Sequence, residues 1–503
     1  MNIKRAKKEI KNAIQAYLQK DDFGEYKIPA IRQRPILLMG PPGIGKTQIM
    51  EQIARECEVS LVAYTITHHT RQSAVGLPFI EKKCYGGKEY SVTEYTMSEI
   101  IASVYEKIEA TGVKEGILFI DEINCVSETL APTMLQFLQC KTFGNQKVPE
   151  GWIIVAAGNP PEYNKSVRDF DVVTLDRIKK IEVEENYEVW KEYAYCAQIH
   201  PAILSYLELK KENFYKMETS VDGREFATAR GWEDLSEFLK AYEELGKKAD
   251  REVVHQYIQH WKIAKDFAIY LELFEKYKRD YGLEHILEGR FDPASAERLK
   301  MAPFDEKLSV VGMLMGKLSG LFKECYQVDQ YVTMLYDALK RYKENHQLDL
   351  VCKEIAGEYE RLRKAEQLSK EEDRIWRKTV SVLEGYQFMT VRDHLGKTEG
   401  FAVVKEAFGK EVEARQELFD RTGRALDYTF TFLEEAGLTG QEMVAFIAEL
   451  NTDYYSIQYL KENDCEKYYM YNKRLLFDEQ QEKILGQLEE VEKQLGEMEL
   501  LKE

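Results

Sequence analysis

The chain carries the stretch ILLMGPPGIGKTQIMEQIARE at residues 36–56. Its first four residues form an apolar run with the length and composition of a buried strand. GPPGIGKT at 40–47 satisfies the pattern G-x-x-x-x-G-K-[ST], and the residues after it have the apolar spacing of a helix. A strand, a glycine-rich turn and a helix in this order predict a phosphate-binding loop in an α/β fold.

The residue types in this loop indicate how it would hold a nucleotide. Gly43 and Gly45 let successive backbone N–H groups turn inward as an anion cradle, to which the following helix adds the positive end of its dipole. Lys46 is expected to reach the β- and γ-phosphates of ATP, and the Thr47 hydroxyl to coordinate Mg²⁺. The expected nucleotide contacts are Gly40, Pro41, Pro42, Gly43, Ile44, Gly45, Lys46, Thr47 and Gln48, together with Asp121 from a later motif.

Two later apolar runs end in polar residues. In ILFIDE at 117–122, Asp121 is expected to hold Mg²⁺ through a water, and Glu122 to orient and deprotonate the attacking water. WIIVAAGNP at 152–160 places Asn159 where a polar side chain can lie beside the γ-phosphate. The alternatives are solvated carboxylates at a strand end and an Asn-Pro turn without ligand contact. The upstream loop favours catalytic roles for all three residues.

The rest of the chain divides into two kinds of pattern. Up to about Glu184, apolar runs such as SLVAYTI at 60–66 alternate with amphipathic segments, which indicates a parallel sheet flanked by helices. The first 20 residues predict a helix whose apolar face docks on the domain that follows. After Glu185 the pattern is helical.

The order of these motifs resembles that of the AAA+ superfamily, and their residues resemble those of its MoxR-like, dynein-related members. The resemblance covers roughly residues 30–245. It rests on DEIN at 121–124, VPEGWIIVAAGNPPEYN at 148–164, FDVVTLDRI at 170–178 and TARGWEDLSEFL at 228–239. It implies an α/β P-loop AAA+ core, with a parallel sheet sandwiched by helices, then an α-helical lid and a large all-α carboxyl-terminal region.

The resemblance also implies roles for three arginines. Arg177 occupies the arginine-finger position, from which it would reach the γ-phosphate bound by a neighbouring subunit. Arg168 is either a second contact of this kind or a surface arginine in an ordinary salt bridge. Arg230 matches sensor 2, which would contact the phosphates of its own subunit. A finger that acts between subunits implies a ring, and the family implies a homohexamer.

The expected domains are an N-terminal helix with an adenine-side linker at 1–34, the AAA+ nucleotide-binding domain at 35–185, a lid at 186–282 and an all-α region at 283–503. In the linker, Tyr26, Ile28 and Ile31 are expected to supply part of the base pocket. Two segments, 79–92 and 141–149, are predicted β-hairpins that face either a pore or client, or only solvent. An apolar seam at 484–498 predicts a final helix, either packed on its own domain or forming an oligomerisation coil.

Composition limits the function. The 87 acidic residues exceed the 70 basic ones, and a net charge of −17 disfavours a nucleic-acid partner. Neither a signal sequence nor a run of 18 apolar residues is present, so the expected location is the cytoplasm, with no membrane partner. The eight cysteines contain no C-x-x-C pair, which predicts reduced thiols.

The leading hypothesis is a Mg-ATP-driven ring that remodels, assembles or matures a protein client, for example a metalloenzyme. By the resemblance, its partner would contain a von Willebrand factor A domain. One alternative is a nucleic-acid-directed AAA+ motor of the restriction or helicase type, which would need a basic reader or pore. Another is a nucleotide-dependent scaffold without turnover.

Overall fold

The computed structural model of the chain describes residues 1–68, 71–143, 146–163, 170, 172–220, 223–392 and 397–475. These residues fall into two units, each of which is described by itself. The first unit comprises Met1–Val189, Thr228–Arg230 and Leu335–Val404. The second comprises Trp190–Ala227, Gly231–Met334 and, among the described residues, 405–475.

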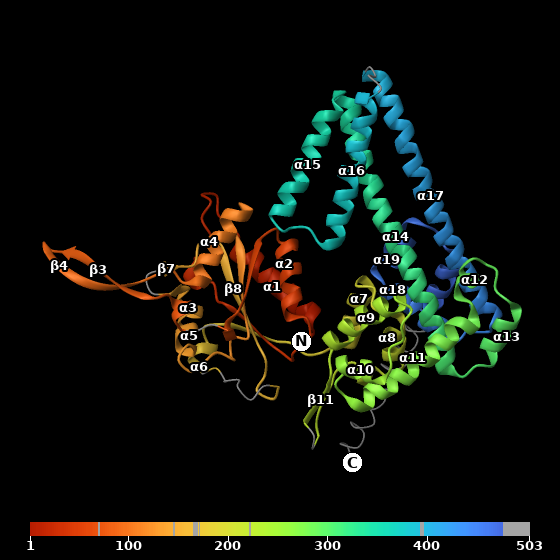
Figure 1. The fold of residues 1–503 in the computed structure, drawn as a ribbon, viewed down its shortest axis with the longest axis horizontal. Coiled ribbons are helices and arrows are strands. Elements are labelled where there is room, and N and C mark those ends of the chain that lie inside the picture. The colour runs from red at the N-terminus through yellow and green to blue at the C-terminus, as the bar shows by residue number, and fades with distance from the viewer. Residues whose placement is uncertain are drawn as a thin grey trace, which may run out of the picture. The chain divides into compact units, whose positions relative to one another are not determined.

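A parallel sheet of five strands forms the centre of the first unit, in the order β2-β5-β8-β1-β9 (Figure 1). Its strands are β1 (Ile36–Met39), β2 (Ser60–Thr65), β5 (Gly116–Asp121), β8 (Trp152–Gly158) and β9 (Lys179–Glu182). The four apolar runs read from the sequence are the first four of these strands. The sequence did not predict β9, because this edge strand reads KKIE and buries Ile181 alone.

Helices cover both faces of the sheet, as its alternating side chains require. On one face, Ile36 and Leu38 pack with the apolar sides of α1 (Ile3–Tyr17) and α2 (Lys46–Glu56). On the other face, Leu37 packs with α4 (Glu99–Thr111) and α5 (Ala131–Cys140). The predicted α/β core sandwiched by helices is therefore confirmed, as is the docking of the N-terminal helix.

Both predicted β-hairpins are present. Strand β3 (Pro78–Tyr85) pairs with β4 (Lys88–Tyr95), and the hairpin extends away from the sheet (Figure 1). Its turn residues Gly86 and Gly87 have φ of 57° and 79°, the left-handed pair that a two-residue hairpin turn of this kind needs. The second hairpin joins β6 (Thr142–Phe143) to β7 (Gln146–Lys147).

The first unit also contains a helical hairpin from far along the sequence. Helices α15 (Leu348–Lys364) and α16 (Lys370–Arg392) pack against each other. The segment between them contacts the α/β core at two points. The Glu366 carboxylate lies 2.6 Å from the Lys107 ammonium on α4, and the Gln367 side chain donates to the Glu58 carbonyl, 3.2 Å away, just after α2.

The second unit is mostly helical, as predicted. The helices not yet named in the two units are α3 (Arg71–Val75), α6 (Val172–Leu175), α7 (Tyr187–Cys196), α8 (Pro201–Leu209), α9 (Ala229–Glu244), α10 (Arg251–Tyr257), α11 (Trp261–Tyr281), α12 (Leu283–Leu287), α13 (Pro293–Met301), α14 (Phe304–Asn345), α17 (Lys397–Glu435), α18 (Gln441–Thr452) and α19 (Tyr454–Glu462). The structure adds an antiparallel strand pair, β10 (Lys216–Ser220) with β11 (Gly223–Ala227), which the sequence did not predict. Its strands read KMETS and GREFA, so they lack the apolar runs that identified the central strands.

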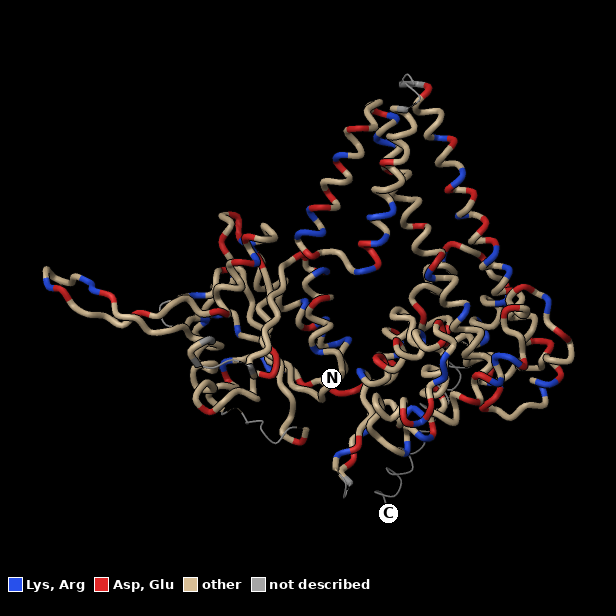
Figure 2. The backbone as a smooth tube through the Cα atoms, in the orientation of Figure 1, with Lys and Arg blue, Asp and Glu red and all other residues tan. Residues whose placement is uncertain are grey.

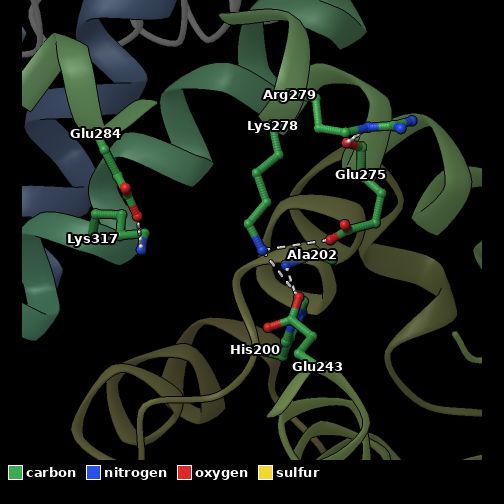
Figure 3. A network of polar contacts seen from close by, with 8 residues as sticks. All are labelled: His200, Ala202, Glu243, Glu275, Lys278, Arg279, Glu284 and Lys317. Atoms are coloured by element: carbon green, nitrogen blue, oxygen red, sulfur yellow. Dashed lines mark hydrogen bonds and ion pairs between the residues drawn. The ribbon is translucent and has the colours of Figure 1, made fainter. Parts of the chain in front are cut away.

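A polar network fixes the end of α9 inside the second unit (Figure 3). The buried His200 ring accepts the Ala202 N–H through Nδ1, 3.2 Å away, so its Nε2 carries the proton and donates to Glu243, at 3.3 Å. Lys278 on α11 lies 3.2 Å from the same carboxylate. The hydrogen bond from His200, together with the charge of Lys278, lowers the pKa of Glu243 to about 2. The network therefore holds α8, α9 and α11 together.

Several expectations concern the chain as a whole. None of the eight cysteines, all of which the structure describes, forms a disulfide bond, as predicted. Among the described helices, none is both long and apolar enough to cross a membrane. The apolar seam at 484–498 lies outside the described residues. The boundaries proposed for the four domains stay predictions.

Candidate nucleotide site

Three neighbouring strands bring the predicted motifs to one edge of the sheet. Gly40 follows β1, Asp121 ends β5, and Asn159 follows β8, which lies between the other two. Because all three strands are parallel, their carboxyl ends lie side by side. Residues far apart in the sequence therefore meet at the position where ligands bind open α/β sheets.

The loop after β1 has the backbone that the glycine pattern predicts. Gly43 and Gly45 have φ of 75° and 89°, a region that side-chain-bearing residues rarely adopt. Gly45 is also the N-cap of α2, so the free N–H groups of this helix begin inside the loop. The loop thus has the conformation of an anion cradle at a helix N-terminus.

Lys46 is buried in this loop among neutral acceptors. Its side-chain nitrogen donates to the carbonyls of Gly40 and Pro41, at 2.7 and 2.8 Å, and to Asn159 Oδ1 at 2.8 Å. Burial lowers the pKa of Lys46 to about 8, against the opposing charges of Asp121 and Glu122. A phosphate oxygen at this position would replace a neutral partner by a negatively charged one.

Thr47 and Asp121 form a second link between the motifs. The Thr47 hydroxyl lies 3.0 Å from Asp121 Oδ2, and Asp121 Oδ1 accepts the Glu122 N–H at 2.9 Å. A hydroxyl and a carboxylate oxygen at one point are the oxygen ligands that Mg²⁺ takes in nucleotide sites. The residues present therefore fit a magnesium ion, which Thr47 would hold directly and Asp121 through a water.

Glu122 occupies an unusual backbone conformation directly after β5. Its φ of 57° lies in the left-handed region, which is costly for a residue with a side chain. The chain leaves the sheet at this residue, and the Ile123 N–H then donates to the Ala157 carbonyl of β8, 2.9 Å away. The partly buried Glu122 is thus carried on a turn fixed between β5 and β8.

Asn124 is a site residue that the sequence did not single out. Its side chain donates to the Asn159 carbonyl at 2.8 Å and accepts the Asn159 N–H at 3.3 Å. The stretch DEIN contains Asn124, but this contact depends on the path of the chain after Glu122. Spacing alone gives no signal for it.

The start of α9 lies against the loop. The Arg230 N–H donates to the Gly43 carbonyl at 3.2 Å, and Thr228 packs beside Gly43. The Arg230 side chain is exposed, and its charge helps to lower the pKa of Lys46 after the larger effect of burial. The structure therefore places Arg230 at the loop of residues 40–47, which Asp121 and Asn159 also approach.

Arg177 does not join this cluster. It is exposed, and its Nη1 donates to Gln139 on α5, 2.5 Å away. Among the described residues, the Arg177 side chain makes this hydrogen bond and makes none to Lys46, Thr47 or Asp121. Arg168 lies outside the described residues.

The expected base pocket around Tyr26 is not supported. The Tyr26 hydroxyl donates to Glu115, 2.9 Å away and directly before the start of β5. The amino ends of parallel strands lie at the opposite edge from their carboxyl ends, so Tyr26 lies at the edge away from the loop. Ile31 is 87% exposed. The linker takes this path because Gln33, which is buried, donates to the carbonyls of Tyr17 and Ile28.

Comparisons with known proteins agree with the geometry of this site. Residues 36–175 match the model of the ATPase family associated with various cellular activities (AAA). No curated protein sequence matches the chain.

Two solved structures show remote similarity. A candidate ATPase from Cytophaga hutchinsonii is 16% identical, with a TM-score of 0.20 over 36% of this chain and 52% of its own. PCH-2 from C. elegans is 15% identical, with a TM-score of 0.24 over 43% of this chain and 50% of its own. The chain thus spans about half of each, and we draw no conclusion from either likeness. The family match and the converging motifs together show that the chain carries, at residues 36–175, an ATP-hydrolysing domain of the AAA+ type.

Proposed function

We propose that this chain is a Mg-ATP-dependent AAA+ ATPase of the MoxR type, which hydrolyses ATP in an oligomeric ring to remodel, assemble or mature a protein partner. One observation supports the catalytic part most strongly. Lys46 contacts Asn159 at 2.8 Å while its neighbour Thr47 contacts Asp121 at 3.0 Å, so three separate strand ends are joined through two adjacent residues. A strand end with merely solvated carboxylates would not need these links.

The residues then take the following roles. The N–H groups of the loop and the Lys46 ammonium hold the phosphates, and the Asn159 amide lies beside the γ-phosphate. Thr47, and Asp121 through a water, would hold a magnesium ion, which would neutralise charge on the phosphates. Glu122 orients the attacking water and accepts its proton. Glu122 is carried on the turn that directly follows β5, where its N–H donates to Asp121 Oδ1.

The ring follows from what the single chain leaves incomplete. Arg230 lies at the loop of its own chain, whereas Arg177 is exposed and directed to Gln139. An arginine that stabilises the transferred phosphoryl group is worth about 10³–10⁵ in rate. We assign this role to Arg177 of a second copy. Head-to-tail contacts of this kind form a ring when their rotation closes.

The proposed client is a protein, for example one with a von Willebrand factor A domain. The β3–β4 hairpin supports a protein contact, because it presents large apolar side chains to solvent. Ile80 and Tyr85 on β3, and Leu77 directly before it, are each more than half exposed. A separate two-stranded hairpin is marginally stable in water, so a bound surface would stabilise it.

The charge distribution gives no support to a nucleic-acid motor. The net charge is −17, and basic and acidic residues are interspersed along α15, α16 and α17 (Figure 2). Interspersed charges do not form the basic stripe that follows a phosphate backbone.

Steady-state ATP hydrolysis by the purified chain tests the proposal. Wild type is expected to turn over ATP only with Mg²⁺. Glu122→Gln keeps the shape of the side chain but not the base, so we expect at least a hundredfold loss of turnover with ATP still bound. Lys46→Ala should lose nucleotide binding itself. A wild-type chain that binds MgATP without turnover would instead indicate a nucleotide-dependent scaffold.

A further inference from the structure

The side chain of Asn124 continues the sheet where β5 has ended. Strand β5 pairs with β8 up to Ile120 opposite Ala156, and the Ile123 N–H still reaches the Ala157 carbonyl. Beyond that point no β5 backbone remains to pair with Asn159. The primary amide of Asn124 takes over, donating to the Asn159 carbonyl at 2.8 Å and accepting its N–H at 3.3 Å.

This contact needs both halves of an amide. The N–H and C=O of one residue in a strand point to the same side, so a complete partner must offer one donor and one acceptor at a fixed spacing. An asparagine side chain has this arrangement, whereas an aspartate offers acceptors only. The partners of Asn124 therefore also fix which way its amide faces.

The surroundings leave Asn124 little freedom. The residue is 3% exposed, so any unpaired donor or acceptor here would be cut off from water. Gly158 lies against it, and a Cβ added there would come within 2.6 Å of Asn124 Oδ1. Gly158 therefore provides the room in which the amide fits.

Asn124 joins two groups that the reaction needs in register. Asn124 holds the backbone of Asn159, and the Asn159 side chain contacts the Lys46 ammonium at 2.8 Å. Through its own backbone it lies two residues after Glu122, on the turn that begins with the left-handed φ of 57°. One side chain thus links the carboxylate expected to activate water with the amide expected to meet the γ-phosphate.

We propose that Asn124 is a positioning residue for ATP hydrolysis, which holds Asn159 and the Glu122 turn at a fixed separation. This inference rests on the proposed hydrolysis at this site. Because Asn124 acts through Asn159, its loss affects the chemical step more than the binding of the diphosphate, whose contacts come from the loop at 40–47.

The test compares wild type with Asn124→Asp, Asn159→Ala and the double variant. Asn124→Asp keeps the size of the side chain and the bond to the Asn159 N–H, but it places a carboxylate oxygen against the Asn159 carbonyl. We expect kcat to fall at least about tenfold while the Kd for ADP stays within about threefold. We expect the double variant to lose no more than Asn159→Ala alone, because both changes remove one shared function.

Gly158→Ala provides an independent variant if Asn124→Asp folds poorly, since its methyl group displaces the same amide without removing it. It should reproduce the loss in kcat at unchanged ADP affinity. Losses that multiply in the double variant, or a kcat within twofold of wild type for both Asn124→Asp and Gly158→Ala, would overturn the inference. Absence of turnover by wild type would instead overturn the proposed function, so the two failures are distinguishable.

Discussion

At the scale of single residues, the burial of Lys46 has a measurable consequence. Its ammonium contacts two carbonyls and an amide oxygen, and burial lowers its pKa to about 8. A bound diphosphate adds negative charge next to this nitrogen and so raises its pKa. We therefore expect nucleotide binding to be coupled to the uptake of a proton.

We predict that ADP affinity is constant below about pH 8 and falls, by up to about tenfold per pH unit, above it. The sign follows from the pKa values. Above pH 8 the free chain has lost the Lys46 proton, whereas the complex, with its raised pKa, must take the proton up again. Titration calorimetry at pH 8.5 in two buffers of different ionisation enthalpy measures this uptake.

Lys141 offers a matched control for that measurement. Burial lowers its pKa to about 8 as well, but it lies after α5 and donates to Gln33 rather than to a residue of the nucleotide site. Lys141→Gln should leave the proton uptake unchanged. Equal uptake at pH 6.5 and pH 8.5 by the wild-type chain would contradict the coupling to Lys46.

The residues of the site differ in how well the sequence predicts them. Lys46, Thr47, Asp121, Glu122 and Asn159 could be found because each follows an apolar run at a strand end, and parallel strands bring these ends together. Asn124 could not, because its partner is a backbone group on another strand.

At the scale of elements, the tip between α15 and α16 connects a distant segment to the nucleotide domain. It contacts Glu58, directly after the helix that begins at Lys46, and Lys107 on α4. The helical pattern of this region was readable from the sequence. The contact of this tip with the core could not be predicted from the sequence. The two residues of the salt bridge are 259 positions apart, so no local pattern indicates the pairing.

We predict that Lys107→Glu loosens this tip. The Lys107 side chain is 17% exposed and Glu366 is 66% exposed, so the pair is worth a few tenths of a kcal/mol to about 1 kcal/mol. Amide hydrogen exchange of residues 365–369 should therefore be about two- to fivefold faster. Adding Glu366→Lys restores opposite charges and should restore the rate, whereas Lys114→Glu serves as a nearby charge control. An exchange rate unchanged by Lys107→Glu would show that the salt bridge does not hold the tip.

The elements also show where pattern reading fails. The buried strands were predicted because both faces of a parallel sheet are covered by helices, which requires continuous apolar runs. Strands β9, β10 and β11 were missed because each carries charged residues on an exposed side. The path of the linker past Tyr26 was misread because tertiary contacts of Gln33 and Glu115, not local spacing, set it.

At the scale of the whole molecule, the proposed ring makes the chain part of a larger assembly. The AAA domain occupies residues 36–175, and the long helical remainder has no counterpart in the family match. The central claim is that ATP is hydrolysed at a site that one chain begins and a second copy completes. In the proposed arrangement, Glu122 belongs to the first copy and Arg177 to the second.

Mixing two inactive variants tests this claim most directly. Arg177→Ala keeps its own Glu122 but lacks the finger, while Glu122→Gln lacks the base but still offers Arg177 to a neighbour. We predict that each variant alone is nearly inactive. At concentrations where light scattering shows that the chains associate, an equimolar mixture should recover a substantial part of wild-type ATP turnover. A mixture no more active than its components, although mixed oligomers form, would contradict a site shared between copies.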